Sequence, residues 1–181
     1  MKYYYSLLFI CFSIAIRASN CNLIIDCVKS YDNKLLNSIV ISGCDINSSD
    51  ENGATPIMWA VYVENFEAVK FLHKSGADLH PKGIIYTNAN KTGYYGNLTG
   101  IAAGVGNLDI LKYLIEDCNL SPNEKGYNPQ NKLNDGWSPL FCAVYKGNEE
   151  VTLYLLSIGV NGNQMFENGN HVLFYCILEG M

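Results

Sequence analysis

A chain of 181 residues can form one domain with a proper core or a short array of stacked repeats, and we expect a single such unit. Apolar residues make up 49% of the sequence and charged residues 16%, a balance typical of folded globular proteins that excludes wholesale disorder. The formal net charge of -5 excludes a nucleic-acid partner, because affinity for phosphates needs a clustered excess of basic residues.

The N-terminal segment has the pattern of an export signal. Lys2 is followed by an uncharged, mostly apolar run over residues 3–16, which ends at Arg17. A membrane-spanning helix needs about 20 apolar residues, so this run resembles a cleaved signal peptide and indicates no stable membrane insertion. We expect residues 1–19 to be removed and the protein to reach the bacterial periplasm or the exterior. If the segment is not a working signal, the protein is cytoplasmic. A lipoprotein signal at Cys21 fits less well.

Two sequence markers that lie 33 positions apart organise the rest of the chain. Ser42–Asn47 (SGCDIN) recurs as Ser75–His80 (SGADLH), and Asp50–Val61 (DENGATPIMWAV) runs between them. This period and this sequence closely resemble the ankyrin repeat with its Thr-Pro-Leu-His core. The resemblance implies an all-α fold, a solenoid of stacked helix-turn-helix units joined by β-turns and loops.

Local chemistry in this unit agrees with the resemblance. Asn52-Gly53 predicts a tight turn, Thr55 is expected to cap the following helix with its hydroxyl, and Pro56 suits the first helical position. Asn65 is expected to cap the second helix, and Gly76 to end it in a left-handed conformation.

The same pattern predicts about five units within residues 20–181. One further clear unit contains Asp135–Ala143 (DGWSPLFCA), and an intermediate one contains Asn97–Glu116, with Leu98 where proline is usual. The outer units are degraded, as expected for repeats that meet water on one side. The predicted units are 20–48, 49–81, 91–123, 132–164 and a truncated 165–181, with loop insertions at 81–96 and 124–132 that should project from the edge carrying the turns.

Catalytic and metal-binding patterns are weak in this sequence. The histidines are His73, His80 and His171, and neither of the first two is expected to meet a cysteine. Gly106 is explained as the glycine between two helices, so residues 104–106 are not a dinucleotide loop. No cysteines or histidines have the close spacing of a zinc site. We therefore predict no enzyme activity, no cofactor and no metal.

The cysteines leave two alternatives open. Removal of the signal would leave cysteines 21, 27, 44, 118, 142 and 176, which could pair in an oxidising compartment. Cys27 and Cys176 occupy the small core position that alanine holds in the other units, where a buried thiol replaces alanine. We expect structural free thiols. Three disulfides, or a cysteine-based redox protein with a low-pKa thiol, are the alternatives.

Surface aromatic residues are the strongest functional signal. The resemblance to ankyrin domains implies that turn tips and first helices contact a protein partner, and tryptophan and tyrosine dominate binding energy at such interfaces. Trp59 and Phe141 are assigned to the core. We expect a monomeric, non-enzymatic scaffold with an unidentified protein partner; a periplasmic immunity or stabilising protein for a toxin or enzyme, and a secreted host-directed effector, are alternatives. The predicted partner-binding residues are Glu51, Asn52, Tyr62, Tyr86, Tyr94, Tyr95, Asp135, Trp137 and Tyr145.

Overall fold

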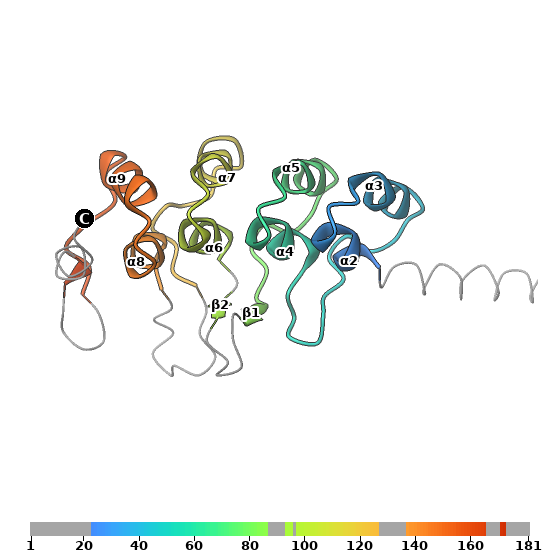
Figure 1. Cartoon of the computed structure of the whole chain (residues 1–181), viewed down its shortest axis with the longest axis horizontal. Helices are drawn as coiled ribbons and strands as arrows, with labels where there is room; N and C mark the ends of the chain where they lie inside the picture. Colours follow the sequence, from blue (N-terminus) through green and yellow to red (C-terminus); the bar gives the residue numbers. More distant parts are fainter. Residues whose placement is uncertain (1–22, 87–92, 96, 127–136, 166–170, 173–181) are drawn as a thin grey trace, which may run out of the picture.

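Pairs of short helices stack in two rows along the molecule (Figure 1). The computed structural model describes residues 23–86, 93–95, 97–126, 137–165 and 171–172. The first helices of the pairs form one row: α2 (Ile24–Lys29), α4 (Pro56–Tyr62), α6 (Leu98–Val105) and α8 (Pro139–Tyr145). The second helices form the other row: α3 (Asn33–Ile41), α5 (Phe66–Lys74), α7 (Leu108–Lys112), which continues as the π-helix η1 (Tyr113–Asp117), and α9 (Glu149–Ser157).

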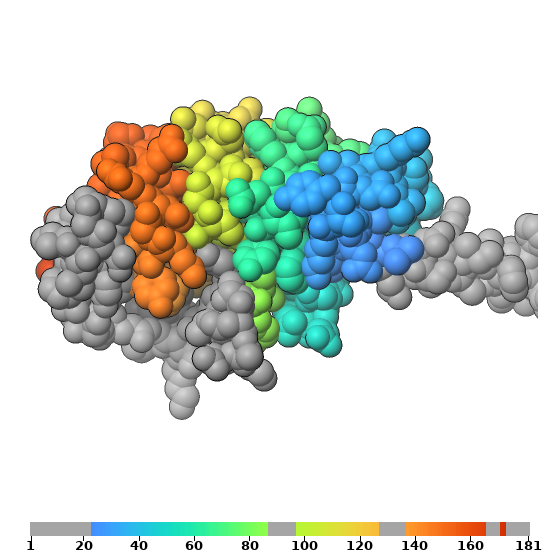
Figure 2. All heavy atoms as spheres, viewed as in Figure 1, coloured from blue at the N-terminus to red at the C-terminus, as the bar shows by residue number. Residues whose placement is uncertain are grey.

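Neighbouring first helices pack against one another, so that α4 contacts α2 and α6, and α6 contacts α8. In the space-filling view, side chains of successive units close the spaces between the ribbons (Figure 2). Asparagines that cap or precede the second helices add hydrogen bonds between units: the buried Asn65 donates from Nδ2 to the Val28 carbonyl at 3.2 Å, and the half-buried Asn148 donates from Nδ2 to the Ala103 carbonyl at 2.8 Å. The prediction of an all-α repeat solenoid is confirmed.

Most of the predicted helix caps are present. Pro56 and Pro139 lie in the first turns of α4 and α8, and the Asn65 side chain accepts from the Ala68 amide at 3.1 Å at the start of α5. The prediction for Thr55 is wrong. Its hydroxyl makes no cap hydrogen bond, and within the described residues Thr55 Oγ1 is buried without a partner. The turn before α4 is held instead by the carboxylate of Asp50.

Left-handed residues end the second helices and also separate the two helices of a unit. Gly76 has the predicted positive φ of 89°, and Asn119 takes the same role at the end of η1 with φ 55°. Between the helices of the third and fourth units this position is glycine, whereas the first two units place Tyr31 (φ 60°) and Glu64 (φ 61°) there. A side chain with a Cβ is strained in this conformation, so the first two units are imperfect at this point.

The third unit has one extra residue in its second helix. The left-handed residue follows the capping asparagine by 11 positions in Asn65–Gly76 and in Asn148–Gly159, but by 12 in Asn107–Asn119. A π-turn, in which each hydrogen bond spans five residues, absorbs one additional residue without breaking the helix. The π-helix η1 lies directly before Asn119 and performs this adjustment. This extra residue was not predicted from the sequence.

The 81–96 insertion contains a hairpin that the sequence analysis did not predict. Strands β1 (Ile84–Tyr86) and β2 (Gly93–Tyr95) are antiparallel, with Ile84 opposite Tyr95. The hairpin lies beyond the first helices, on the side away from the second helices (Figure 1). Most of the other insertion, 124–132, falls outside the described residues.

Close backbone packing anchors the base of this hairpin. The Ile84 amide donates to the Asn52 carbonyl at 3.1 Å, and Ile85 is 0% exposed. Gly83 lies against the turn of the second unit, where an added Cβ would be 2.0 Å from the Gly53 carbonyl oxygen. Only glycine fits at that distance, so the insertion is built into the array.

No helix in the described part of the chain combines the length and the apolar character needed to cross a membrane.

Candidate functional site

The first helices of the second, third and fourth units carry no charged side chain. Their sequences are PIMWAVY in α4, LTGIAAGV in α6 and PLFCAVY in α8. The second helices, by contrast, carry charged residues, among them Glu67 and Lys70 in α5 and Glu149 and Glu150 in α9. The first helices of these three units therefore differ in polarity from the second helices and suit apolar contact with another molecule, whereas α2 of the first unit carries Asp26 and Lys29.

An aromatic cluster covers one face of α8. The centroid of the Trp137 ring lies 4.3 Å from that of Phe141 and 5.0 Å from that of Tyr145, and the Phe141 and Tyr145 rings are stacked at 5.9 Å with an interplanar angle of 14°. Trp137 is 42% exposed and Tyr145 is 51% exposed. A large part of each outer ring thus faces solvent while the cluster holds its orientation.

Local sequence explains why these rings meet. Ser138 caps α8 by accepting from the Phe141 amide at 3.2 Å, and Pro139 begins the helix. Residues four apart lie on the same face of a helix, so Phe141 and Tyr145 stand one above the other. Trp137, which precedes the cap, folds over this first turn and completes the row.

The structure brings together two predicted partner-binding residues, Trp137 and Tyr145, and adds Phe141. The assignment of Phe141 to the core is only partly right, because the side chain is half-buried and its ring contacts both exposed rings. The spacing of four residues from Trp137 to Phe141 and from Phe141 to Tyr145 was the signal that could have identified it.

A second aromatic pair lies on α4. Trp59 and Tyr62 are half-buried, with ring centroids 5.7 Å apart in an edge-on arrangement. The indole Nε1 of Trp59 donates to Asp50 Oδ2 at 2.8 Å, and the ammonium of Lys29 lies 3.6 Å from the centroid of the indole. Trp59 is therefore more than an apolar core residue, since its indole contacts both the carboxylate of Asp50 and the ammonium of Lys29.

Helix α6, which lies between the α4 pair and the α8 cluster, presents no large side chain to solvent. Gly104 takes the place that Tyr62 and Tyr145 have in their units, and every residue from Leu98 to Gly104 is buried. Strand β2 contacts α6. The exposed aromatic surface is thus divided into an α4 part and an α8 part.

The other predicted partner-binding residues are spread along the turn edge. Glu51 and Asn52 are exposed in the turn before α4, and Tyr86 is half-buried in β1. Tyr94 and Tyr95 belong to β2, and the structure describes their backbone but not their side chains. Asp135 lies outside the described residues. Among the described side chains of this group, those of Glu51, Asn52 and Tyr86 form no hydrogen bond or ring contact with the α8 cluster.

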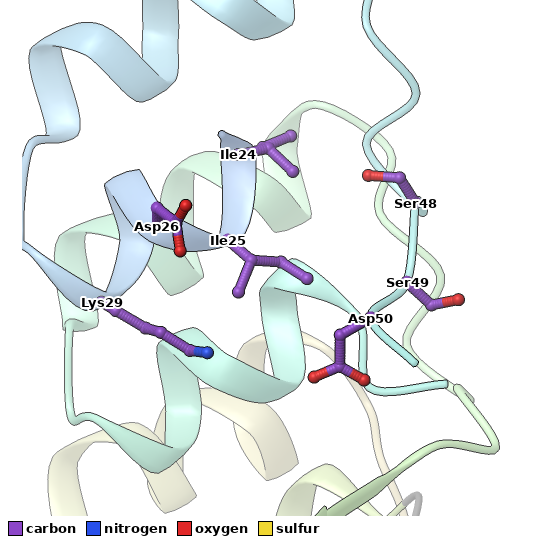
Figure 3. Close-up of a pocket in the computed structure, with 7 residues that line it drawn as sticks. All are labelled: Ile24, Ile25, Asp26, Lys29, Ser48, Ser49 and Asp50. Atoms are coloured by element: carbon purple, nitrogen blue, oxygen red, sulfur yellow. The ribbon is translucent and has the colours of Figure 1, made fainter. Parts of the chain in front are cut away.

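A cavity of about 280 Å³ opens where α2 faces the turn of the second unit. Figure 3 shows side chains of α2 on one side and those of the turn on the other. Its lining combines apolar, hydroxyl and charged groups: Ile24, Ile25, Asp26, Lys29, Ser48, Ser49 and Asp50. Neither the cavity nor Lys29 was singled out from the sequence.

One histidine does meet a cysteine, which corrects the sequence-based expectation. Because α5 and η1 pack side by side, His73 Nδ1 lies 3.3 Å from Cys118 Sγ and 2.9 Å from the Tyr113 hydroxyl. This contact does not activate the thiol: burial, with a contribution from the charge of Asp117, raises the pKa of Cys118 to about 11. A protonated thiol is a poor nucleophile and a poor metal ligand.

The other described cysteines divide into free thiols and one disulfide. Cys27, Cys118 and Cys142 are free, and burial raises the pKa of Cys27 and raises that of Cys142 to about 12. Cys44 is disulfide-bonded, so the expectation of free thiols is wrong at that position. None of the described thiols has the lowered pKa of a redox centre. Within the described residues, no three His, Cys, Asp or Glu side chains are grouped to hold a metal ion.

Comparison with known proteins agrees with the repeat architecture. The family described as "Ankyrin repeats (3 copies)" matches residues 24–125 and 99–181. This chain belongs to the ankyrin-repeat family. Ankyrin repeats suggest a scaffold for protein–protein interaction, and the family is typically non-enzymatic.

Similar proteins come from a virus and a bacterium. An ankyrin repeat protein of fowlpox virus is 32% identical over 59 residues, which is 32% of this chain and 12% of the viral protein. An ankyrin repeat protein of Borreliella burgdorferi is 46% identical over 37 residues, which is 20% of this chain and 17% of the bacterial protein. The matched segments thus span only a small part of either relative.

Proposed function

We propose that this protein is a non-enzymatic scaffold that binds a protein partner through the aromatic cluster of Trp137, Phe141 and Tyr145 on α8. The supporting observation is that two large aromatic side chains, 42% and 51% exposed, stand in fixed contact on a helix without charges. Tryptophan and tyrosine lose little side-chain entropy on binding and bury a large area, so they carry much of the energy of protein interfaces.

The remaining predicted residues extend this surface along the turn edge. Glu51 and Asn52 in the turn of the second unit, Tyr62 on α4, the hairpin tyrosines 86, 94 and 95, and Asp135 would contact the partner around the cluster. Polar residues at the rim of an interface contribute less energy than a buried aromatic centre. Substitutions at Glu51 or Asn52 should therefore weaken binding less than a substitution at Trp137.

Capture of the partner by the purified chain tests this placement. Affinity capture from the native organism, read by mass spectrometry, identifies the proteins that the unmodified chain retains. Replacing Trp137 and Tyr145 together with Ala should reduce retention of the specific partner at least about 30-fold, which corresponds to the roughly 2 kcal/mol that one such residue contributes at an interface centre. Retention that does not change would remove the cluster from the binding site.

Leu153→Ala is the matched control. Leu153 is 59% exposed and also apolar, but it belongs to α9 in the other row. Its replacement should leave capture unchanged, and far-ultraviolet circular dichroism of all variants should match that of the unmodified chain. A loss of capture equal to that of the double variant would show that the assay measures general surface hydrophobicity.

We further propose that the scaffold is exported and acts as a monomer. The apolar run after Lys2 supports export, and so does the disulfide at Cys44, because disulfides persist in oxidising compartments. N-terminal sequencing of the protein from its native cells should find a first residue near position 20, and light scattering should give one chain per particle. An intact Met1 on the protein in the cytoplasm would refute export.

The partner decides between the two biological roles. A periplasmic toxin or enzyme encoded by a neighbouring gene would indicate an immunity or stabilising protein, whereas a host protein would indicate a secreted effector. A cysteine-based redox role has no support from the described thiols, whose pKa values are raised.

A further inference from the structure

We propose that the cavity between α2 and the turn at Ser48–Asp50 receives an arginine side chain of a protein partner. This inference rests on the proposed role in protein binding but not on the α8 cluster, since the cavity lies at the other end of the row of first helices (Figures 1 and 3). Its volume of about 280 Å³ is below the range of sites for drug-sized ligands and suits a single long side chain.

Asp50 supplies a fixed carboxylate. Its Oδ1 accepts from the amides of Asn52 at 2.9 Å and Ala54 at 3.0 Å, and its Oδ2 accepts from the indole of Trp59 at 2.8 Å. Three donors hold the group in one orientation. Both lone pairs of Oδ1 are thus in use, and Oδ2 keeps one lone pair for a donor that enters the cavity.

Asp26 supplies a second carboxylate, from the first turn of α2. In the part of the chain that the structure describes, the ion pairs are Lys70–Glu67 and His80–Glu124, so neither Asp26 nor Asp50 is paired with a cation. The cavity therefore presents two carboxylates whose charge has not been neutralised by direct contact.

Lys29 also lines the cavity, but its ammonium contacts the Trp59 ring and forms no ion pair with Asp26 or Asp50. The nitrogen lies 3.6 Å from the centroid of the Trp59 ring, in a cation–π contact. With two carboxylates against one ammonium, the lining keeps a net negative charge. The whole chain is also acidic, at -5, which attracts a basic partner over a longer range.

The shape and chemistry of the lining favour arginine over lysine. Ile25, which is half-buried, offers apolar surface along which the methylene stem of a long side chain can lie, with the buried Ile24 behind it. The guanidinium has five donors in a planar fork and needs several acceptors around it. The hydroxyl of Ser48, which points toward α2 (Figure 3), and the two carboxylates provide acceptors.

Trp59 offers a direct reporter of occupancy. The chain has two tryptophans, and the indole proton of Trp59 is bonded to Asp50, at the cavity. N-acetyl-argininamide is titrated into the isotope-labelled full chain and the indole N–H resonances are followed by NMR, with Trp137→Phe used for assignment. A saturable shift of the Trp59 signal is expected with half-saturation near 1–10 mM, the scale of a few charge-assisted hydrogen bonds at an open site. The Trp137 signal should not move.

Charge variants give the sign of the effect. Asp26→Asn should weaken the response at least about fivefold, and Lys29→Gln should strengthen it about two- to threefold, because each removes one charge from the lining. N-acetyl-citrullinamide, which has the shape of the probe without its charge, should give no saturable shift. An equal response to citrullinamide, or an unchanged response in Asp26→Asn, would overturn the proposal.

Two further arms exclude other occupants. A saturable response to N-acetyl-glutamine amide or N-acetyl-glutamate amide in place of the arginine probe would show that the site takes another class of ligand. Arg17 is the only arginine of the chain and precedes α2. If Arg17→Gln shifts the Trp59 signal without added probe, the occupant is the chain itself and not a partner. Each of these results refutes the proposal for the cavity. None of them bears on the proposed role of the α8 cluster, which the capture assay tests separately.

Discussion

Replacing Glu64 with glycine should stabilise the array. Glu64 separates α4 from α5 with φ 61°, a conformation that costs a residue with a Cβ about 1–2 kcal/mol. The third and fourth units place Gly106 and Gly147 at the same point, with φ 86° and 70°. Glycine loses more chain entropy on folding, which offsets about 0.5–1 kcal/mol of this gain.

One polar contact is lost with the Glu64 side chain. Asn107 Nδ2 donates to Glu64 Oε2 at 3.0 Å, but the contact is exposed, so its net contribution is about 0.5 kcal/mol. Glu64→Ala removes the same hydrogen bond and keeps the strained Cβ. The difference between the two variants therefore isolates the backbone term, and Glu64→Gly should be more stable than Glu64→Ala by about 1 kcal/mol.

The measurement is urea unfolding followed by circular dichroism, supported by thermal melting. For a chain of this length, 1 kcal/mol corresponds to about 2–4 °C in Tm. If Glu64→Gly melts at or below the temperature of Glu64→Ala, the strain at position 64 is not relieved by glycine and the reasoning from the positive φ is refuted.

Three other substitutions or reactions test separate parts of the structure. Gly83→Ala should lower the free energy of unfolding by about 2–4 kcal/mol, because the new Cβ would lie 2.0 Å from the Gly53 carbonyl oxygen. An unchanged urea midpoint would contradict this close packing. Gly100→Ala should raise stability by about 0.5–1 kcal/mol, since it lies inside α6 and the atoms nearest to its Cβ would be those of the Asn97 side chain, at 3.4 Å or more. A lower Tm would contradict this expectation. Iodoacetamide should modify Cys118 about 100-fold more slowly in the folded chain than in the unfolded chain near neutral pH, as followed by mass spectrometry. The rate in the folded chain should rise through pH 10 toward the Cys118 pKa of about 11. Fast modification at pH 7 would show that the thiol is ionised and contradict the raised pKa.

The repeat architecture could be predicted because it depends on local chemistry. The 33-residue period, Pro56 in the first turn of α4, the Asn65 cap and the left-handed Gly76 are each set by neighbouring residues, and all appear in the structure. The hairpin could not be predicted in this way. It depends on Gly83 meeting the turn at Gly53, a contact between segments 30 positions apart.

Contacts between units were the part that sequence reasoning missed. His73 was predicted to lie on an exposed side of its helix, but this prediction does not indicate which residues of the next unit lie opposite it. In the structure these residues are Cys118 and Tyr113. Counting the residues between Asn107 and Asn119 would have revealed the π-turn, because the other units are one residue shorter there. The α8 cluster was found in part, as Trp137 and Tyr145, since both were expected to be exposed.

The two tryptophans make the cooperativity of the array measurable. Trp59 belongs to the second unit and Trp137 to the fourth, so variants that keep one or the other place an intrinsic fluorophore in each half of the stack. The stability of a repeat protein is the sum of contributions from each unit and from its interfaces with the adjacent units. Helix α6, which lies between the two fluorophores, contains two glycines and therefore has a low intrinsic helix propensity. If emission from the two halves changes at different urea concentrations, this solenoid unfolds from one end, and the boundary between its folded and unfolded parts falls at α6.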